Sequence, residues 1–580
     1  MNRNGRRPTS ARPLRSLVAV LVAAAFLAAA TAQSLAALLP SETLAAVGVQ
    51  GLAQHKDQLQ PFIDEWDRLG LTDLLEQSGG DAVGDEIPAD LQGMNLFDVL
   101  GDEVWIGVSA SSVSPVPAVT VVGRMSDKAA ALLSSSLAEE NAGSEVQTLT
   151  EGKIEFKVYT SDDDEMPVAM AQDGNFLAFS TNPDALRGVL RRYQGAKEPN
   201  FTDSKTYSST LAAISPALVS FVIDLPAVVD VVMPFAKGMG FDQSAQRVAN
   251  MLKTMGVFAT TVRLTDAGVE TLSLHALGDR SLDPALFDLL SNKTGYPSAV
   301  LSFVPDSAVG VQAGATDIPA IWAYLNQLVG QLPELGISDL DSFISDNLGL
   351  DLNLMLFGWM GPGTASITIS SPAATQPGIT PENLLGDSVY LVAVKDEAAA
   401  AAGLSQFLTT ATSMGASFVA PDSDSGMVQP TTRQSSGVDV TSYAVGDGLT
   451  FETAFTDGYL LIATSSGAMD ASLAAHASHR SGLAGALAPL QKNVPAGATT
   501  MALSNDQASL RTLADTLLSQ LGLAAGMTGS EDLDFDAVEA TGDALTQFVN
   551  FVADRLGGSY SYQVPDGNVI RGYGLLSVTW

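Results

Sequence analysis

The 580-residue chain contains no cysteine. This absence excludes disulfide bonds, a thiolate nucleophile, zinc bound through cysteine and a lipid anchor on an N-terminal cysteine. Histidine is also scarce, at four residues, and aromatic side chains make up only 7% of the chain. Stability must therefore come from a packed aliphatic core, which a hydrophobic content of 46% can supply.

Basic residues are few. The chain has 29 Lys and Arg against 64 Asp and Glu, a formal net charge of −35. Five of the arginines lie before residue 33, so removal of that segment leaves 24 basic residues and a net charge of −40. Such a surface excludes nucleic acid as a partner and disfavours anionic lipid headgroups. Solubility, adaptation to salt and loose binding of cations all remain open as reasons for the acidity.

Residues 1–32 have the pattern of a signal peptide. A basic stretch from Arg3 to Arg15 precedes an apolar stretch from Leu17 to Ala29, and Ala30-Thr31-Ala32 fits the cleavage rule. The alternative is an uncleaved anchor, because the apolar run is long enough to span a bilayer. We therefore expect export to the periplasm or cell envelope, with membrane contact only if the N-terminal segment is retained.

The chain repeats itself. Ala46-Val47-Gly48-Val49-Gln50 recurs as Ala308-Val309-Gly310-Val311-Gln312. Further matches follow in the same order at slowly rising offsets: Asp127 with Asp396, Asp173-Gly174 with Asp457-Gly458, Leu186 with Met469, Leu190 with Leu473, Gly256 with Gly557, and Asp266 with Asp566. Such a pattern predicts two homologous tandem modules, 33–279 and 301–580, joined by a linker at 280–300.

Each module is predicted to be α+β, with a mainly antiparallel sheet packed with helices. Asp173-Gly174 predicts a tight hairpin turn between two short strands. Asn182 is the predicted N-cap of the next helix, and Pro183 is its first residue. An earlier amphipathic segment, from Leu59 to Leu69, predicts a helix with Pro61 near its start.

Several segments resemble a family of bacterial envelope proteins known as domain of unknown function three-three-five-two. They are Leu100 to Trp105, Asp173 to Thr181 with the following helix, Pro199 to Ser204, and the strand from Leu218 to Asp224. The resemblance covers most of the mature chain and implies an N-terminal export or anchor segment. It implies no activity. The second module departs from it, with Gly361-Pro362-Gly363 in place of Gly101-Asp102-Glu103.

No catalytic or cofactor-binding residue can be assigned. The chain lacks a Gly-x-Ser-x-Gly elbow and a phosphate loop, and Gly238-x-Gly240 lacks the third glycine of a dinucleotide fingerprint. His476-x-x-His479 has helical spacing and could present two imidazoles to zinc, but a third ligand and a general base are missing. A solvated helix surface is the favoured interpretation. His275 falls on a predicted strand, where a packed or edge residue is expected.

Metal candidates are limited to acidic clusters. Asp532, Asp534 and Asp536 have the alternate spacing of a calcium loop, but Ala537 stands where that loop needs glycine. A solvated acidic face is the alternative. No resident cofactor is expected.

The sequence thus favours an exported, non-enzymatic cell-envelope protein with a binding or scaffolding role, whose partner is an unknown envelope component or an apolar ligand. One alternative is a carrier for a lipid or other apolar ligand, which predicts an aliphatic cavity. The other is an acid-dependent hydrolase, which predicts two convergent carboxylates in a cleft.

Overall fold

The computed structural model describes residues 34–71, 103–110, 116–126, 145–160, 167–238, 242–332, 336–369, 387–419, 430–445, 449–479, 483–511 and 535–580. The predicted signal peptide lies outside them. The chain forms two compact units. Unit 1 comprises residues 1–239, 255–278 and 580, and unit 2 comprises residues 240–254 and 279–579. Residues 240–254 therefore belong to unit 2 by their contacts. The module boundaries at 33–279 and 301–580 remain a prediction.

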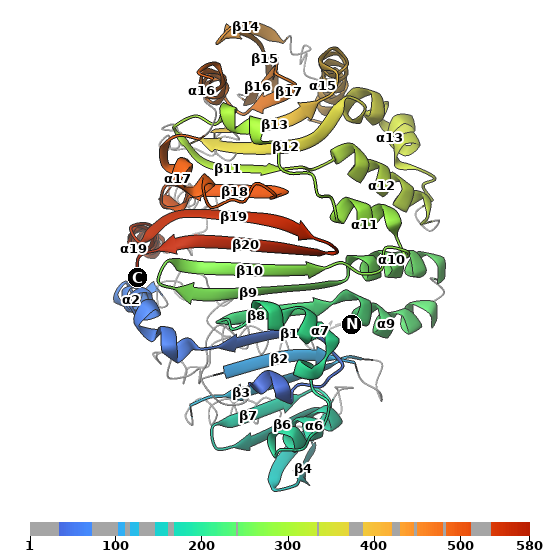
Figure 1. The fold of residues 1–580 in the computed structure, drawn as a ribbon, viewed down its shortest axis with the longest axis vertical. Coiled ribbons are helices and arrows are strands. Elements are labelled where there is room, and N and C mark those ends of the chain that lie inside the picture. Colours follow the sequence, from blue (N-terminus) through green and yellow to red (C-terminus); the bar gives the residue numbers. More distant parts are fainter. Residues whose placement is uncertain are drawn as a thin grey trace, which may run out of the picture. The chain divides into compact units, whose positions relative to one another are not determined.

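Among its described residues, unit 1 has ten strands, and Figure 1 draws strands as arrows. They are β1 (Thr43–Gln50), β2 (Glu103–Ser109), β3 (Ala118–Arg124), β4 (Glu145–Glu151), β5 (Ile154–Thr160), β6 (Val168–Asp173), β7 (Phe176–Ser180), β8 (Val219–Asp224), β9 (Val257–Thr265) and β10 (Gly268–Ala276). Their order in the sheet is β4-β5-β6-β7-β3-β2-β1-β8-β9-β10, and every neighbouring pair is antiparallel.

The first helical segment of unit 1 precedes β1, and the others connect the strands. They are η1 (Leu35–Leu38), η2 (Leu52–His55), α2 (Lys56–Arg68), α6 (Pro183–Tyr193), η6 (Phe201–Asp203), α7 (Lys205–Ser209), α8 (Leu211–Ile214) and α9 (Leu225–Gly238). Pro61 lies inside α2 and not near the helix start, because the preceding 3-10 turn leads directly into α2 at Lys56.

The described part of unit 2 also has ten strands. They are β11 (Ala308–Gly314), β12 (Met360–Ile369), β13 (Asp387–Val394), β14 (Thr431–Ser435), β15 (Val438–Val445), β16 (Leu449–Thr456), β17 (Tyr459–Ala463), β18 (Thr500–Asn505), β19 (Leu556–Asp566) and β20 (Val569–Val578). Their order is β14-β15-β16-β17-β13-β12-β11-β18-β19-β20, again antiparallel throughout.

The helical segments of unit 2 include most of α10 (Asp242–Met255). The others are α11 (Pro284–Leu290), η7 (Ser298–Phe303), α12 (Ile318–Gly330), α13 (Leu340–Leu348), η9 (Asn353–Phe357), α15 (Glu397–Val419), α16 (Ser466–Ala477), η11 (Gly485–Leu487), α17 (Ala488–Gln491) and α19 (Phe535–Ala553). Among the described residues, no helix is both long enough and apolar enough to cross a membrane.

The two units share one strand order, with β11 to β20 taking the places of β1 to β10. The α+β class with antiparallel sheets is confirmed. The register differs in detail, since β1 shifts against β2 between Thr43 and Ala45, whereas β11 shifts against β12 between Ala308 and Gly310. The main core of unit 2 gathers side chains of η7, β11, β13 and α16.

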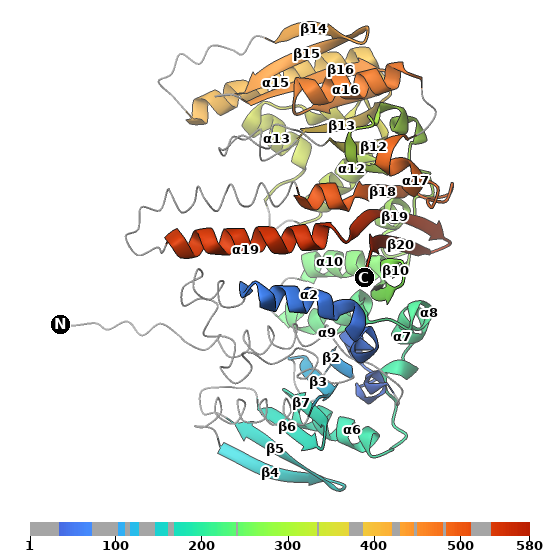
Figure 2. The ribbon, with the colours of Figure 1, turned by 90° about the vertical axis from the view of Figure 1, so that its left-hand side faces the viewer.

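Helix α6 follows the Asp173-Gly174 hairpin, as the sequence predicts. The Asn182 side chain accepts hydrogen bonds from the backbone N–H groups of Asp184 and Ala185, and Pro183 needs no such partner. Leu186, Val189 and Leu190 are fully buried because their spacing of three and four residues places them on one face. Helix α6 packs on β6 and β7, and η1 lies against it (Figure 2).

Candidate functional site

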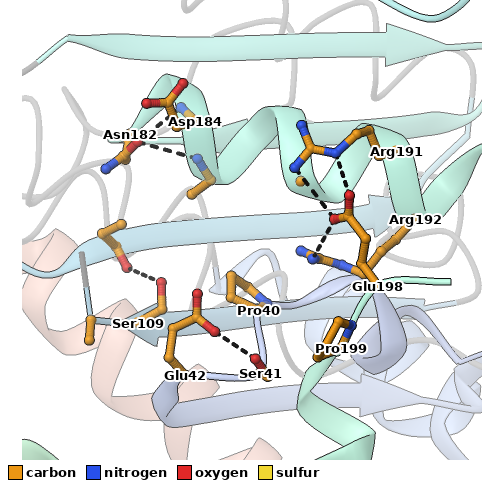
Figure 3. Close-up of a pocket in the computed structure, with 14 residues that line it drawn as sticks. Pro40, Ser41, Glu42, Ser109, Asn182, Asp184, Arg191, Arg192, Glu198 and Pro199 are labelled. Atoms are coloured by element: carbon orange, nitrogen blue, oxygen red, sulfur yellow. Dashed lines mark hydrogen bonds and ion pairs between the residues drawn. The ribbon is translucent and has the colours of Figure 1, made fainter. Parts of the chain in front are cut away.

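Two adjoining cavities lie beside α6 in unit 1. The first, here called the α6 cavity, has a volume of about 330 Å³, and its wall includes Glu42, Gly188 and Arg191. The neighbouring cavity has a volume of about 600 Å³. Arg192 and Glu198 belong to the walls of both. Figure 3 shows Arg191, Arg192 and Glu198 gathered at one end of the α6 cavity, with Glu42 nearer the other end. Volumes of this size suit a small ligand.

A buried carboxylate, that of Glu103, holds the 3-10 turn η1 in place beside the cavities. Glu103, only 6% exposed, begins β2 beneath η1. Its Oε1 accepts hydrogen bonds from the Leu35 N–H, the Ser34 hydroxyl and the Trp105 indole N–H, each within 2.9 Å. These bonds give the buried carboxylate its donors, and they give the backbone N–H at the start of η1 an acceptor that the turn itself does not supply. Glu103 therefore fixes η1 on the sheet and acts as a structural group.

Arg192 is the distinctive side chain of the site. It lies in the last turn of α6, is 9% exposed, and donates from Nε to the Leu38 carbonyl at 2.8 Å. Its Nη1 is 3.6 Å from Glu198 Oε2, which makes an ion pair longer than a hydrogen bond. Its Nη2 is buried and has no hydrogen-bond partner among the described residues. A buried guanidinium N–H without an acceptor is costly, and such groups in native proteins call for an explanation.

The acids around Arg192 are paired mainly with other arginines. Burial lowers the pKa of Arg192, while Glu198 and Glu42 act against this shift. Glu198 is taken up mainly by Arg191, whose Nε donates to its Oε1 at 2.6 Å. Asp184, another lining acid, is paired with Arg187 at 2.8 Å. An arginine keeps its charge at any physiological pH, so Arg192 adds a positive charge to the wall shared by the cavities.

Gly188 makes room for that guanidinium. A Cβ at this position would lie 3.4 Å from both Nη1 and Nη2 of Arg192, one helical turn further on. This distance lies at the border between a tight and an ordinary contact, so a methyl group here would touch the guanidinium directly. A glycine within a helix costs about 1 kcal/mol relative to alanine. Its presence here is explained by the arginine that lies over it.

The equivalent place in unit 2 has no such arginine. The offset that relates Leu186 to Met469 places Ala475 at the position of Arg192 and His476 at that of Tyr193. The His476 ring stacks on Phe303 of η7, with centroids 4.0 Å apart. Both rings are tied to the preceding hairpin turn, Tyr193 through Asp173 and His476 through Asp457.

The histidine pair of the sequence does not form a metal face. Helix α16 ends at Ala477, and His479 follows it with a positive φ of 49°. The expected solvated surface is also wrong for His476, whose side chain is 20% exposed. Its Nδ1 lies 2.8 Å from Ser302 Oγ, a hydroxyl that also lies 2.8 Å from the Ala299 carbonyl, and its Nε2 lies 2.8 Å from Asp457 Oδ2. The carboxylate can only accept, so Nε2 donates to it, and Nδ1 accepts from the serine hydroxyl in the neutral ring and donates to it in the charged ring.

The remaining predicted candidates are spread apart or lie outside the described residues. Asp532 and Asp534 are outside them, and only the backbone of Asp536 is described. Within the described ranges, no group of three or more His, Asp or Glu is placed to hold a metal. The ring of His275 packs edge-on against Phe258, with centroids 6.1 Å apart, and its Nε2 lies 2.6 Å from the Met255 carbonyl.

Sequence reasoning missed Arg192. One signal was present, because a glycine inside a predicted helix often marks a close approach, and an arginine follows Gly188 by one turn. The other components could not be foreseen. They depend on the turn from Leu38 to Pro40 meeting the segment from Glu198 to Asn200, where Phe201 donates its N–H to the Leu39 carbonyl.

The fold and the site define an α+β protein of antiparallel units in which unit 1 holds polar cavities beside a capped helix. The profile of the family described as "Protein of unknown function (DUF3352)" matches residues 96–484, about two thirds of the chain. The chain belongs to this family. The match is one span that crosses from unit 1 into unit 2.

Solved structures offer only distant similarity. Crystal forms III and I of a protein named TP0453 are similar to this chain at 11% and 10% sequence identity. The aligned parts cover 45% and 43% of this chain and 86% and 80% of that protein, with TM-scores of 0.26 and 0.23. Scores this low establish no shared fold. No protein with curated annotation matches this chain.

Proposed function

We propose that this chain is an exported, non-enzymatic binding protein of the cell envelope, and that the α6 cavity is its binding site. The observation that supports this is the buried Arg192, which lies in the wall shared by two cavities and whose guanidinium makes a single hydrogen bond within the described residues, to the Leu38 carbonyl. A ligand acceptor that reached this guanidinium would form a charge-assisted hydrogen bond with it. The basic and apolar pattern of residues 1–32 supports export.

The identical strand orders support a duplication as the origin of the two units. In that proposal the ancestral module supplied the sheet and the capped helix to both copies. Only unit 1 has the arginine at position 192, so binding is assigned to unit 1 and a supporting role to unit 2.

The acid-dependent hydrolase is less well supported. Three carboxylates are buried within the described ranges, Glu103, Asp283 and Glu452. Each is held by an arginine, a helix N-terminus or both: Arg124 lies 3.8 Å from Glu103, Arg247 lies 3.0 Å from Asp283, and Arg433 lies 2.6 Å from Glu452. Catalytic acids require a partner that is not already neutralised in this way.

A carrier for an apolar ligand is also less well supported. It predicts a cavity lined by Ala, Leu, Val and Met. Both cavities beside α6 instead present charged side chains, with Arg192 and Glu198 in the wall they share. Such a lining fixes the orientation of a polar ligand.

Native mass spectrometry of the protein isolated from its own envelope tests the proposal. We expect the wild type to carry an added mass of small-ligand size and Arg192→Gln to lose it. Arg68→Gln is the control, since Arg68 is an exposed arginine of unit 1 and neither it nor its partner Glu65 belongs to a cavity wall. An added mass that is equal in all three proteins, or absent from the wild type, would contradict the assignment.

A further inference from the structure

We infer that helix α12 of unit 2 is a docking surface for a basic amphipathic helix of a partner protein. This surface goes beyond the proposed ligand site, since it belongs to unit 2 and does not involve the α6 cavity of unit 1. Three observations support it: an exposed apolar stripe, a long stretch of sequence without basic residues, and a contrast with the corresponding helix of unit 1.

Helix α12 exposes a stripe of large apolar side chains. Ile321 and Leu325 are each 40% exposed, and Leu328 is half-buried. Their spacing of four and three residues places them on one face of the helix. None of the 13 residues of α12 is charged. Exposed apolar surface of this kind is typical of a site that another molecule covers.

Helix α13 and the turn η9 lie against α12 and expose further apolar side chains (Figure 1). The Asp341 carboxylate of α13 accepts from the Trp322 indole N–H at 2.8 Å, from the Asn326 amide at 3.0 Å and from the Asn353 amide of η9 at 2.7 Å. These bonds hold the three segments together. The large apolar side chains that α13 and η9 expose are Phe343, Leu348 and Leu354.

The charge around α12 is entirely acidic in the sequence. Residues 294–394 contain nine Asp and Glu and no Lys, Arg or His. Asp346 and Asp351 are exposed beside these apolar side chains, and neither forms an ion pair within the described residues. A partner with basic side chains would therefore gain charge complementarity that this part of the chain does not supply for itself.

Arg247 of α10 also approaches α12, but on its buried side. The Arg247 Cζ lies 5.9 Å from the ring centroid of Tyr324, a residue that is buried. Its Nη2 lies 3.0 Å from the buried carboxylate of Asp283. Arg247 is thus engaged with Asp283 and does not neutralise the exposed side of α12.

Helix α2 holds the corresponding place in unit 1, because it follows β1 as α12 follows β11. Both helices have 13 residues, but α2 carries six charged side chains and α12 carries none. All residues of α2 are described, and none of its large apolar side chains is exposed. Solubility alone would favour the same charged surface on α12, so the apolar stripe there calls for a different cause.

Charge also distinguishes a basic helix from other occupants. A second copy of this chain would bring the same acidic surroundings to the stripe, and an anionic lipid surface would bring further negative charge. An amphipathic helix with Lys or Arg beside its apolar face matches both the stripe and the acids. Helix α12 is about 20 Å long, which suits a partner helix of roughly four turns.

Fluorescence anisotropy with labelled model peptides and the purified full chain tests the inference. The first probe is a 14-residue peptide of leucine and lysine with its leucines on one helical face. The second is a shuffled peptide of the same composition, and the third has glutamate in place of lysine. We expect the first to bind at least about tenfold more tightly than the other two, and more weakly as salt is raised. This series needs no variant of the protein.

Two pairs of substitutions locate the binding on α12. Ile321→Gln with Leu325→Gln should weaken binding of the lysine peptide about tenfold. Val232→Gln with Phe235→Gln is the matched control, because these side chains of α9 in unit 1 are similarly exposed, and it should have no effect. Asp346→Asn with Asp351→Asn should weaken binding about fivefold and reduce its dependence on salt. Asp57→Asn with Asp266→Asn, two exposed acids of unit 1, is the control for charge.

Several results would overturn the inference. They are equal binding of the lysine and glutamate peptides, and equal losses in the α12 and α9 variants, which would indicate non-specific attraction to an acidic protein. Self-association that the α12 variant abolishes, measured by sedimentation, would identify a second copy as the occupant. Binding to phosphatidylcholine vesicles that the same variant abolishes, without binding of the lysine peptide, would identify a lipid surface instead.

Discussion

Gly48 of unit 1 and Gly310 of unit 2 stand at the centre of the same pentapeptide, yet they face different surroundings. A Cβ at Gly48 would lie 2.3 to 2.5 Å from three atoms of the Trp105 ring. A Cβ at Gly310 would meet nothing nearer than 3.7 Å, with Thr368 as its cross-strand neighbour. One glycine is required by a buried indole and the other is not. Identity along one strand therefore says little about the strand opposite.

The same contrast holds for α6 and α16. In unit 1, Glu151 of β4 lies 3.9 Å from Arg191 of α6. In unit 2 the signs are exchanged, because Arg433 of β14 lies 2.6 Å from Asp470 of α16. The strand-to-helix ion pair is shared, but only unit 1 adds a second arginine beside it. Shared backbone geometry has thus allowed the side chains between sheet and helix to differ freely.

The largest expected effect is the difference in stability between alanine substitutions at Gly48 and at Gly310. Gly48→Ala should destabilise unit 1 by roughly 3 kcal/mol, because the methyl group cannot fit without moving Trp105, which is 1% exposed. Gly310→Ala is the matched control and should change the stability of unit 2 by less than about 0.5 kcal/mol, since its surroundings are open. Hydrogen exchange of the full chain, followed peptide by peptide, reports on each unit separately. Equal effects of the two substitutions would contradict the comparison.

The next effect concerns the buried ion pair of unit 2. Glu452 is 1% exposed and accepts from Nε and Nη2 of Arg433 at 3.0 and 2.6 Å. Arg433→Gln should destabilise unit 2 by roughly 2 kcal/mol, because it leaves a buried carboxylate without its cation. The figure is below that of fully buried pairs because the Arg433 side chain is 33% exposed. Arg280→Gln is the control, since its partner Asp288 is exposed, and it should have little effect.

A smaller effect appears as a dependence on pH. Burial raises the pKa values of Glu452 and Asp470, but hydrogen bonds and charge from Arg433, with serine hydroxyls, outweigh it and hold both pKa values below their ordinary range. Carboxyls with lowered pKa values contribute stability above the unfolded value of about 4 and lose it as pH falls through the folded value.

Exchange protection of unit 2 should therefore fall as pH is lowered from about 5 toward 3. Arg433→Gln should flatten this dependence. Thermal unfolding of the two proteins across that range, monitored by circular dichroism, is the measurement. Parallel pH profiles for wild type and variant would show that these carboxyls do not govern the acid response.

Local pattern was enough to predict much of the fold. Asn182 and Pro183 start α6, and Asp566-Gly567 turns the last hairpin, with Gly567 in a left-handed conformation. Such signals are contained in a few adjacent residues. Pro61 was misplaced because the 3-10 turn before α2 moved the helix start towards the N-terminus. That shift depends on how the chain leaves β1, which the spacing of apolar residues does not encode.

The candidate site could not be predicted to the same extent. Arg192 follows Arg191 in the sequence, and nothing in the sequence indicates that one is 43% exposed in its side chain and the other 8%. The difference arises because η1, about 150 residues earlier, lies over α6 and offers the Leu38 carbonyl. Burial of a charged group is set by such long-range contacts, which a single sequence does not reveal.

The smallest effect tests what the two units share. Asn182 accepts from two N–H groups at the start of α6, and Ser465 accepts from the Ala468 N–H at the start of α16. Asn182→Ala and Ser465→Ala should each cost about 1 kcal/mol in their own unit, because both remove an N-cap. Asn182→Asp and Ser465→Asp keep an acceptor and should cost less, as exchange protection of α6 and α16 would show. If the alanine and aspartate variants of one helix lost the same protection, the cap would not be the cause. Losses of similar size in both units would indicate that the units share their backbone and helix caps. The differences between them would then lie in the side chains that α6 and α16 cover.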